Sequence, residues 1–193
     1  LDWLEQRDRE KPFCLLLHHK APHRHWEPDD KHATMYDDID IPEPETFDDD
    51  YSNRSSAAAD AKMRIESDLN SDDLKQPVPE GLTPAEEKSW KYQRYIKDYL
   101  RVIASIDDNV GRVLDYLDDE GLADDTIVVY TSDQGFFLGD HGWYDKRFMY
   151  EESLRMPFVV RWPKVIESGT ATDAMTLNVD FGPLFLEADG VDV

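Results

Sequence analysis

Two polar clusters contain the side chains of this chain that are best suited to chemistry. The first occupies residues 18–25, where four histidines fall within eight positions together with Lys20. The second begins at Asp133-Gln134 and continues through residues 140–147. Packing alone is a poor explanation for so many histidines in one place, which favours a site. A solvated loop stays the alternative for the first cluster taken by itself.

The second cluster offers oxygen donors to a metal ion. Asp133 and the side-chain oxygen of Gln134 are hard donors in consecutive positions, and such donors suit Ca²⁺ or Mg²⁺ better than Zn²⁺. Two donors do not complete a metal site, so the remaining ligands have to come from elsewhere. A turn that ends a strand, with Asp133 as its capping residue, explains Ser132-Asp133-Gln134-Gly135 equally well.

The cationic side chains of the two clusters suit an anionic substrate. Lys20 and Lys146 can supply positive charge, and His23 can supply a proton. This combination fits a tetrahedral anion such as sulfate or phosphate, because the transition state of its transfer gathers charge on oxygen. His23 would then serve as a general acid for the departing alcohol.

Each cluster follows an apolar run of strand length. Residues 11–17 are typical of a buried strand that ends in the first cluster, and residues 125–131 of a β-branched strand that ends near Asp133. Open α/β sheets place their sites at the carboxyl ends of such strands. A third strand is predicted at residues 156–163.

A long helix is predicted between the two clusters. Thr83 can cap its start, Pro84 suits the first helical position, and Glu86 completes a capping box. Apolar residues then follow helical spacing as far as Gly121, which is a natural stop. Shorter helices are expected at residues 1–7, 57–69 and 178–186. The order of strands and helices predicts an α/β layered domain with a largely parallel sheet.

The composition is that of an acidic protein with enough apolar residues for a core. Its 193 residues include 43 acidic and 21 basic side chains, which gives a formal net charge of −22. This excess argues against nucleic acid and an anionic membrane surface as partners, because both are polyanions. No apolar run approaches the roughly 18 residues that a membrane-spanning helix needs. The single cysteine, Cys14, excludes an internal disulfide framework and a cysteine-based zinc cluster.

The negative charge is concentrated in one part of the chain. Residues 29–73 contain 15 acidic and 4 basic side chains, which is half of the net charge. Prolines and runs of Asp and Ser in this part predict loops with little regular structure on a solvated surface. Residues 29–82 are therefore interpreted as an acidic, loop-rich insertion. Three tyrosines of the following helix, Tyr92, Tyr95 and Tyr99, are expected in the core or at its rim.

Several segments resemble the second half of a type I sulfatase. The resemblance is most specific in residues 126–163, which include Thr131-Ser132-Asp133-Gln134-Gly135 and Gly139-Asp140-His141-Gly142, then Lys146, then Tyr150-Glu151-Glu152-Ser153. Lys20-Ala21-Pro22-His23 after an apolar run looks like the histidine motif of that family. The form of residues 145–151 is most similar to the N-acetylglucosamine-6-sulfatase and heparan-type branch. The resemblance covers nearly the whole chain, and we interpret residues 1–193 as the middle-to-late part of a sulfatase catalytic domain.

The resemblance implies an alkaline-phosphatase-like α/β fold and the hydrolysis of sulfate esters of a sugar or glycan. It implies one Ca²⁺ ion and a formylglycine nucleophile, which attacks sulfur. It makes Asp133 and Gln134 metal ligands, His23 the sulfate-binding or leaving-group acid histidine, and Lys146 a sulfate-binding lysine. It places three further residues on the substrate side, namely Lys20, Asp140 and His141.

The formylglycine motif, Cys or Ser followed by x-Pro/Ala-x-Arg, has no match in the chain. Cys14 is followed by Leu15-Leu16-Leu17-His18, so the nucleophile is expected upstream. We therefore expect a fragment that is inactive by itself. Two alternatives stay open, a phosphodiesterase or phosphonate hydrolase of the same superfamily and a non-catalytic binding protein that has kept half a site. A periplasmic or secreted location is an expectation from the family alone.

Overall fold

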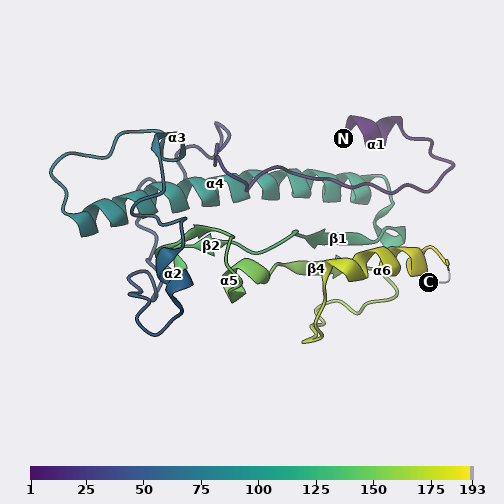
Figure 1. Ribbon diagram of the computed structural model, residues 1–193. Coiled ribbons are helices and arrows are strands. Elements are labelled where there is room, and N and C mark those ends of the chain that lie inside the picture. The colour runs from purple at the N-terminus through teal and green to yellow at the C-terminus, as the bar shows by residue number, and fades with distance from the viewer. Residues whose placement is uncertain (192–193) are drawn as a thin grey trace.

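A long helix lies along a narrow set of strands in the computed structural model, which describes residues 1–191 (Figure 1). The helix α4 (Pro84–Asp119) runs on one side of β1 (Val128–Thr131) and β4 (Phe158–Arg161). The helix α6 (Phe181–Ala188) packs on β4, where the rings of Phe181 and Phe158 stack with their centroids 5.2 Å apart. This layering of helices and strands confirms the predicted α/β class.

The remaining elements are short. They are the helices α1 (Asp2–Gln6), α2 (Ser56–Asp60), α3 (Ser71–Leu74) and α5 (Glu151–Leu154), the strands β2 (Phe137–Leu138) and β3 (Tyr144–Asp145), and the 3₁₀ turns η1 (Ala123–Asp125), η2 (Asp140–Gly142) and η3 (Asn178–Asp180). None of the helices in residues 1–191 combines the length and the apolar character that crossing a membrane requires.

The long helix begins and ends as its sequence predicts. The N–H of Glu86 donates to the hydroxyl of Thr83 at 3.3 Å, and the N–H of Thr83 donates to the carboxylate of Glu86 at 2.8 Å. This reciprocal capping box satisfies backbone donors that have no partner inside the helix. The chain leaves the helix at Gly121, whose φ of +67° lies in the left-handed region that favours glycine.

The paired strands are antiparallel, so the prediction of a largely parallel sheet is wrong for the described residues. In the first pair, Val128 lies opposite Arg161 and Thr131 opposite Phe158. The second pair, β2 and β3, is antiparallel too. A parallel pair requires a crossover to the starting edge. Residues 132–157 instead fold back on themselves, and they return the chain in the opposite direction.

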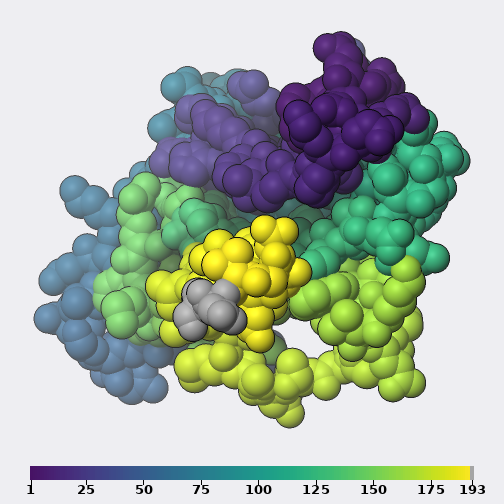
Figure 2. Space-filling view, turned by 90° about the vertical axis from the view of Figure 1, so that its right-hand side faces the viewer, coloured from purple at the N-terminus to yellow at the C-terminus, as the bar shows by residue number. Residues whose placement is uncertain are grey.

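The prediction of a strand at residues 11–17 is also wrong within the described residues. This segment is extended, but it pairs with no strand within residues 1–191. Figure 2 shows the N-terminal segment on the outside of the molecule, and the side chain of Leu16 is 69% exposed. An apolar run becomes a buried strand only when a neighbouring strand satisfies its N–H and C=O groups.

The acidic segment is less superficial than its composition predicts. The expected helix at residues 57–69 is wrong beyond Asp60, where α2 ends. The chain then pairs with η2 and β3 through backbone hydrogen bonds, including Ile65 N–H to Gly142 O at 3.0 Å. Buried apolar side chains of this segment join the core, namely Phe47, Ala58, Met63, Ile65, Leu69 and Leu74. Turns dominate the segment, as predicted, but it does not form a purely solvated surface.

The core is centred on aromatic side chains from distant parts of the chain. Trp26 is fully buried, with its ring centroid 4.6 Å from that of Tyr95 on α4. Tyr92 is buried beside Phe47, and Tyr99 packs against the edge of the core. The prediction that the three helix tyrosines belong to the core or its rim is therefore confirmed.

Candidate active site

Asp133, Gln134 and Lys146 line a single cavity of about 280 Å³. The first two come from the turn that follows β1, and Lys146 follows β3 directly. Five further residues complete the lining, namely Arg147, Phe148, Met149, Ser153 and Leu154. The fold thus brings oxygen donors and a cation to one place from segments that are separate in the sequence.

The turn that carries the oxygen donors is packed closely against α5. The N–H of Gly135 donates to the carbonyl of Ser153 at 2.8 Å. A Cβ atom added at Gly135 would lie 2.2 Å from the carbonyl oxygen of Glu152 and 2.4 Å from that of Arg155. Only glycine fits between these carbonyls. On the other side, Asn178 donates its amide to the carbonyl of Asp133 at 2.9 Å, so the turn is held from two directions.

The donor set of this turn fits a hard cation in part. The carboxylate of Asp133 is exposed, and Gln134 is half-buried beside it in the same cavity. Carboxylate and amide oxygens are ligands that Ca²⁺ prefers, and the ion takes about 6 to 8 of them. Within residues 1–191, no group of three or more His, Cys, Asp or Glu side chains is arranged to hold a metal. These two residues can therefore supply only part of a calcium site.

Lys146 and Arg147 bring cationic side chains to the lining of the same cavity. The Nζ atom of Lys146 lies 5.6 Å from the ring centroid of Phe136, a position that attracts a cation to the face of the ring. Arg147 is bound to the buried carboxylate of Asp145, with Nη2 to Oδ2 at 3.0 Å. Lys146 has no carboxylate within ion-pairing distance among the described residues, so its charge is available to an anion.

The histidine cluster is anchored beside this cavity through aromatic contacts. Trp26, at the end of the cluster, lies 6.4 Å from the ring of Phe136, the same ring that Lys146 faces. The indole N–H of Trp26 donates back to the carbonyl of Pro22 at 2.9 Å, which closes the loop around His23. Lys20 and His23 are exposed and do not line the cavity.

The imidazole of His23 is fixed by its own neighbour. Its Nδ1 lies 2.8 Å from the carbonyl oxygen of Arg24. Because a carbonyl oxygen only accepts hydrogen bonds, Nδ1 carries the proton, and Nε2 of this exposed side chain has no hydrogen-bond partner within residues 1–191. A histidine held in this way can bind an anion through Nε2 or exchange a proton there.

Asp140 and His141 lie outside the lining of the cavity that contains Asp133. The buried Nδ1 of His141 lies 2.7 Å from the carboxylate of Asp49, and its carbonyl accepts a hydrogen bond from Tyr51. Burial raises the pKa of Asp140, and the neighbouring carboxylate of Glu152 raises it further. Neither residue lines the cavity of Asp133. Their expected contact with substrate stays a prediction.

Sequence reasoning missed the residues that hold the site in place. The side chain of Asp73 accepts two hydrogen bonds from Arg24, although the two residues are far apart in the chain. Asn70-x-x-Asp73 is a capping-box pattern, so the turn at α3 could have been found, but nothing near Arg24 indicates its partner. The contact of Asn178 with Asp133 has no sequence signal either.

Comparison with known proteins identifies this arrangement. The sulfatase family model matches residues 1–191. The chain belongs to the sulfatase family. Over its whole length it is 42% identical to an N-acetylglucosamine-6-O-sulfatase from Bacteroides thetaiotaomicron. A solved structure of a protein bound to its substrate, D-glucosamine-2-N,6-O-disulfate, matches the whole chain with a TM-score of 0.95 and 42% identity. The resemblance seen in residues 126–163 is confirmed.

The chain spans less than half the length of these sulfatases. It covers 42% of the Bacteroides enzyme and 47% of the substrate-bound structure. A phosphonate monoester hydrolase from Silicibacter pomeroyi is also similar, with a TM-score of 0.52 and 30% identity over 58% of this sulfatase chain and 22% of that hydrolase. The shared fold therefore extends to an enzyme with a different ester substrate.

Proposed function

We propose that the protein containing this chain is a sulfuric ester hydrolase that removes sulfate from a sulfated sugar. The observation that carries the proposal is the single cavity that Asp133, Gln134 and Lys146 line together. The whole-length similarity to an N-acetylglucosamine-6-O-sulfatase supports a glucosamine 6-sulfate group as the substrate class. The chain would contribute part of the active site, and the rest would come from residues outside it.

In this proposal Asp133 and Gln134 hold a Ca²⁺ ion together with ligands from outside the chain. When bound, the ion supplies positive charge to the sulfate oxygens. Lys146 donates hydrogen bonds to the same anion, and it stabilises the charge that grows on oxygen in the transition state. The nucleophile is a formylglycine outside residues 1–193, because exposed Cys14 lacks the modification motif.

His23 has one of two tasks in this reaction. With Nδ1–H donating to the carbonyl of Arg24, the imidazolium form of His23 can give its Nε2 proton to the leaving alcohol of the sugar and become the neutral Nδ1–H tautomer. Alternatively, the protonated imidazole binds a sulfate oxygen through the same Nε2. Lys20, Asp140 and His141 complete the proposed substrate side, with Lys20 adding charge at the exposed end of the loop.

A sulfated carbohydrate is compatible with the negative charge of the chain. A net charge of −22 repels an extended polyanion such as nucleic acid. A sugar sulfate presents one group at a time, and in this cavity it would meet the cationic side chains of Lys146 and Arg147. We propose a periplasmic or secreted location, in keeping with sulfated glycans as substrates and with the family expectation.

The substitution Lys146→Ala in the full-length protein tests the proposal. We expect kcat/KM for glucosamine 6-sulfate and for 4-nitrophenyl sulfate to fall by about two to three orders of magnitude, because a charge partner of the transition state is lost. Lys164→Ala is the matched control, since Lys164 is bound to Asp125 at 2.8 Å outside the cavity. Unchanged turnover in Lys146→Ala would contradict the assigned role.

A phosphonate monoester hydrolase is the second candidate, favoured by the similarity to the Silicibacter enzyme. The same wild-type protein is therefore assayed with a phenyl phosphonate monoester. Faster turnover of the phosphonate than of either sulfate ester would select the second candidate. Binding of glucosamine 6-sulfate in calorimetry without turnover of any ester would instead indicate a non-catalytic binding protein.

A further inference from the structure

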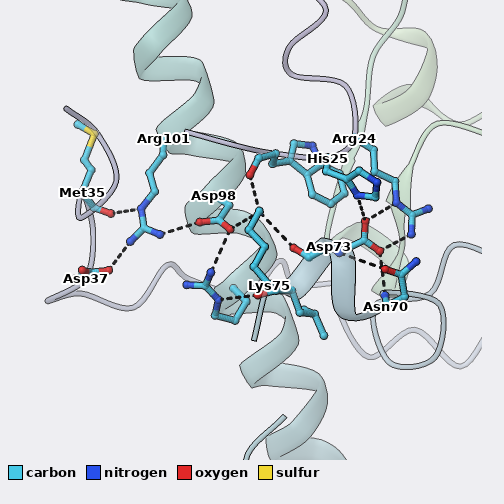
Figure 3. A network of polar contacts seen from close by, with 12 residues as sticks. Arg24, His25, Met35, Asp37, Asn70, Asp73, Lys75, Asp98 and Arg101 are labelled. Atoms are coloured by element: carbon cyan, nitrogen blue, oxygen red, sulfur yellow. Dashed lines mark hydrogen bonds and ion pairs between the residues drawn. The ribbon is translucent and has the colours of Figure 1, made fainter. Parts of the chain in front are cut away.

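A buried polar network lies beneath the histidine loop, outside the proposed cavity (Figure 3). At its centre is Asp73, which is 2% exposed. Both carboxylate oxygens of Asp73 accept hydrogen bonds from the guanidinium of Arg24, and Nδ1 of His25 lies 3.1 Å from one of them. The N–H of Asn70 donates to the other oxygen at 2.9 Å.

Buried carboxylates usually become neutral unless they are paired. Burial alone raises the pKa of Asp73, but hydrogen bonds from Arg24 and the N–H of Asn70 outweigh it, and the pKa is lowered. The charge of Asp73 is therefore retained in the interior and directed at Arg24. A two-bond pair of this kind fixes the plane of the guanidinium as well as its position. The guanidinium also lies over the ring of Tyr144, 5.2 Å from its centroid.

The backbone of the loop is held at two more points. Lys75, two residues after Asp73, donates to the carbonyl of Trp26 at 2.6 Å and to the buried carboxylate of Asp98 at 2.8 Å. Trp26 in turn donates to Pro22. His23 lies between these anchors and is itself exposed. The one side-chain hydrogen bond recorded for His23 runs to the carbonyl of Arg24.

We infer that Asp73 is a positioning residue for His23, acting through Arg24 to hold the carbonyl that fixes the tautomer of the imidazole. The inference rests on the proposed function, in which His23 serves the reaction. Arg24 contributes two groups to this device. Its guanidinium binds the buried carboxylate, and its carbonyl accepts the proton of Nδ1. If the guanidinium of Arg24 is displaced, its carbonyl moves as well. The imidazole of His23 is then no longer held in one orientation.

Asp73→Asn in the full-length protein is the central variant of the test. It keeps the size of the side chain and an acceptor for Asn70, but it removes the charge that holds Arg24. We expect kcat for glucosamine 6-sulfate to fall about 10- to 100-fold, as for a small displacement of a reacting group, with KM changed less than threefold. Asp68→Asn is the control. Asp68 also accepts backbone N–H groups, from Met63 at 2.7 Å and Arg64 at 2.8 Å, but within residues 1–191 it makes no hydrogen bond to the histidine loop.

The variant His23→Ala separates positioning from general damage to the fold. If Asp73 acts through His23, the double variant His23→Ala/Asp73→Asn should be no slower than His23→Ala alone. Losses that multiply in the double variant would show that Asp73 affects turnover by another route, and would overturn the inference. Asp73→Glu keeps the carboxylate charge, so this variant should have a higher kcat than Asp73→Asn.

The ¹⁵N spectrum of histidine-labelled protein gives a readout that does not depend on activity. In the wild type the resonances of His23 should show a protonated Nδ1, and in Asp73→Asn they should show a mixture of tautomers. An unchanged tautomer in Asp73→Asn would overturn the inference. Full activity of His23→Ala, with the tautomer shift still present in Asp73→Asn, would refute the proposed role of His23 and leave the positioning contact established.

Discussion

Replacing Gly135 by alanine should move the oxygen donors of the candidate site. The new Cβ atom would lie 2.2 Å from the carbonyl oxygen of Glu152, whereas ordinary contact begins at 3.4 Å. The turn and α5 must therefore separate by 3.4 − 2.2 = 1.2 Å. The hydrogen bond from Gly135 N–H to Ser153 O, now 2.8 Å long, would open to as much as 2.8 + 1.2 = 4.0 Å.

Both consequences have an expected size. Overpacking costs about 1–3 kcal/mol of stability, and the lost hydrogen bond adds about 1 kcal/mol. Asp133 and Gln134, two and one residues before the glycine, should move by about as much as the turn itself. A misplacement of about 1 Å can lower a rate by roughly a hundredfold. We therefore expect kcat/KM for 4-nitrophenyl sulfate to fall about a hundredfold in full-length Gly135→Ala.

Gly111→Ala provides the matched control. Gly111 lies inside α4, and an added Cβ would meet no atom within 4 Å. Alanine is a better helix former there by up to about 1 kcal/mol, so this variant should be fully active and at least as stable as the wild type. Sulfate release and urea unfolding are measured for both. Wild-type turnover and an unchanged unfolding midpoint in Gly135→Ala would refute the reasoning that this contact holds the turn.

The remaining predictions concern the metal and the response to acid. Asp133→Ala in the full-length protein should weaken Ca²⁺ binding in calorimetry by at least tenfold, because a carboxylate ligand is lost; unchanged affinity, equal to that of the control Asp125→Ala, would exclude Asp133 as a ligand. Burial opposes ionisation of Asp49, but hydrogen bonds from Tyr51 N–H, His141 and Arg54 lower its pKa from 3.8 to about 2. Its stabilising effect is therefore present above pH 3.8 and is lost as the pH falls through about 2. Between pH 3.8 and about 2, the free energy of unfolding should consequently drop less in Asp49→Asn than in the wild type. Asp60→Asn is the control. If the free energy of unfolding depends on pH equally in all three proteins, the assigned pairing of Asp49 is contradicted.

The features that are encoded within a few neighbouring residues could be predicted. The start of α4 depends on Thr83, Pro84 and Glu86, which contact one another directly, and its end depends on Gly121. The strands at 125–131 and 156–163 were located correctly because β-branched runs favour extended backbone wherever they pair. The motifs of residues 126–163 are sufficient to indicate a sulfatase, which the family match confirms.

The direction of the strands and the state of residues 11–17 could not be predicted in the same way. An apolar run has the same composition whether its neighbour is parallel, antiparallel or missing from the described part of the chain. The strands that pair with a run decide its direction and whether it becomes a strand, and these partners are distant in the sequence. The acidic segment was likewise misjudged in part, because a low mean hydropathy conceals the few apolar residues, such as Ile65, that enter the core.

By itself, the sequence determined which chemical groups the candidate site can use. The available groups are fixed by residue type and do not depend on the fold. They are the consecutive oxygen donors of Asp133 and Gln134, the amine of Lys146 and the imidazole of His23. Tertiary structure alone decided that the donors and Lys146 share one cavity, and that Asp73 holds Arg24 across 49 residues of chain. The physical reason is that hydrogen bonds and charge pairs of this kind form only when the packing of the core, here around Trp26 and Tyr95, brings distant segments within about 3 Å.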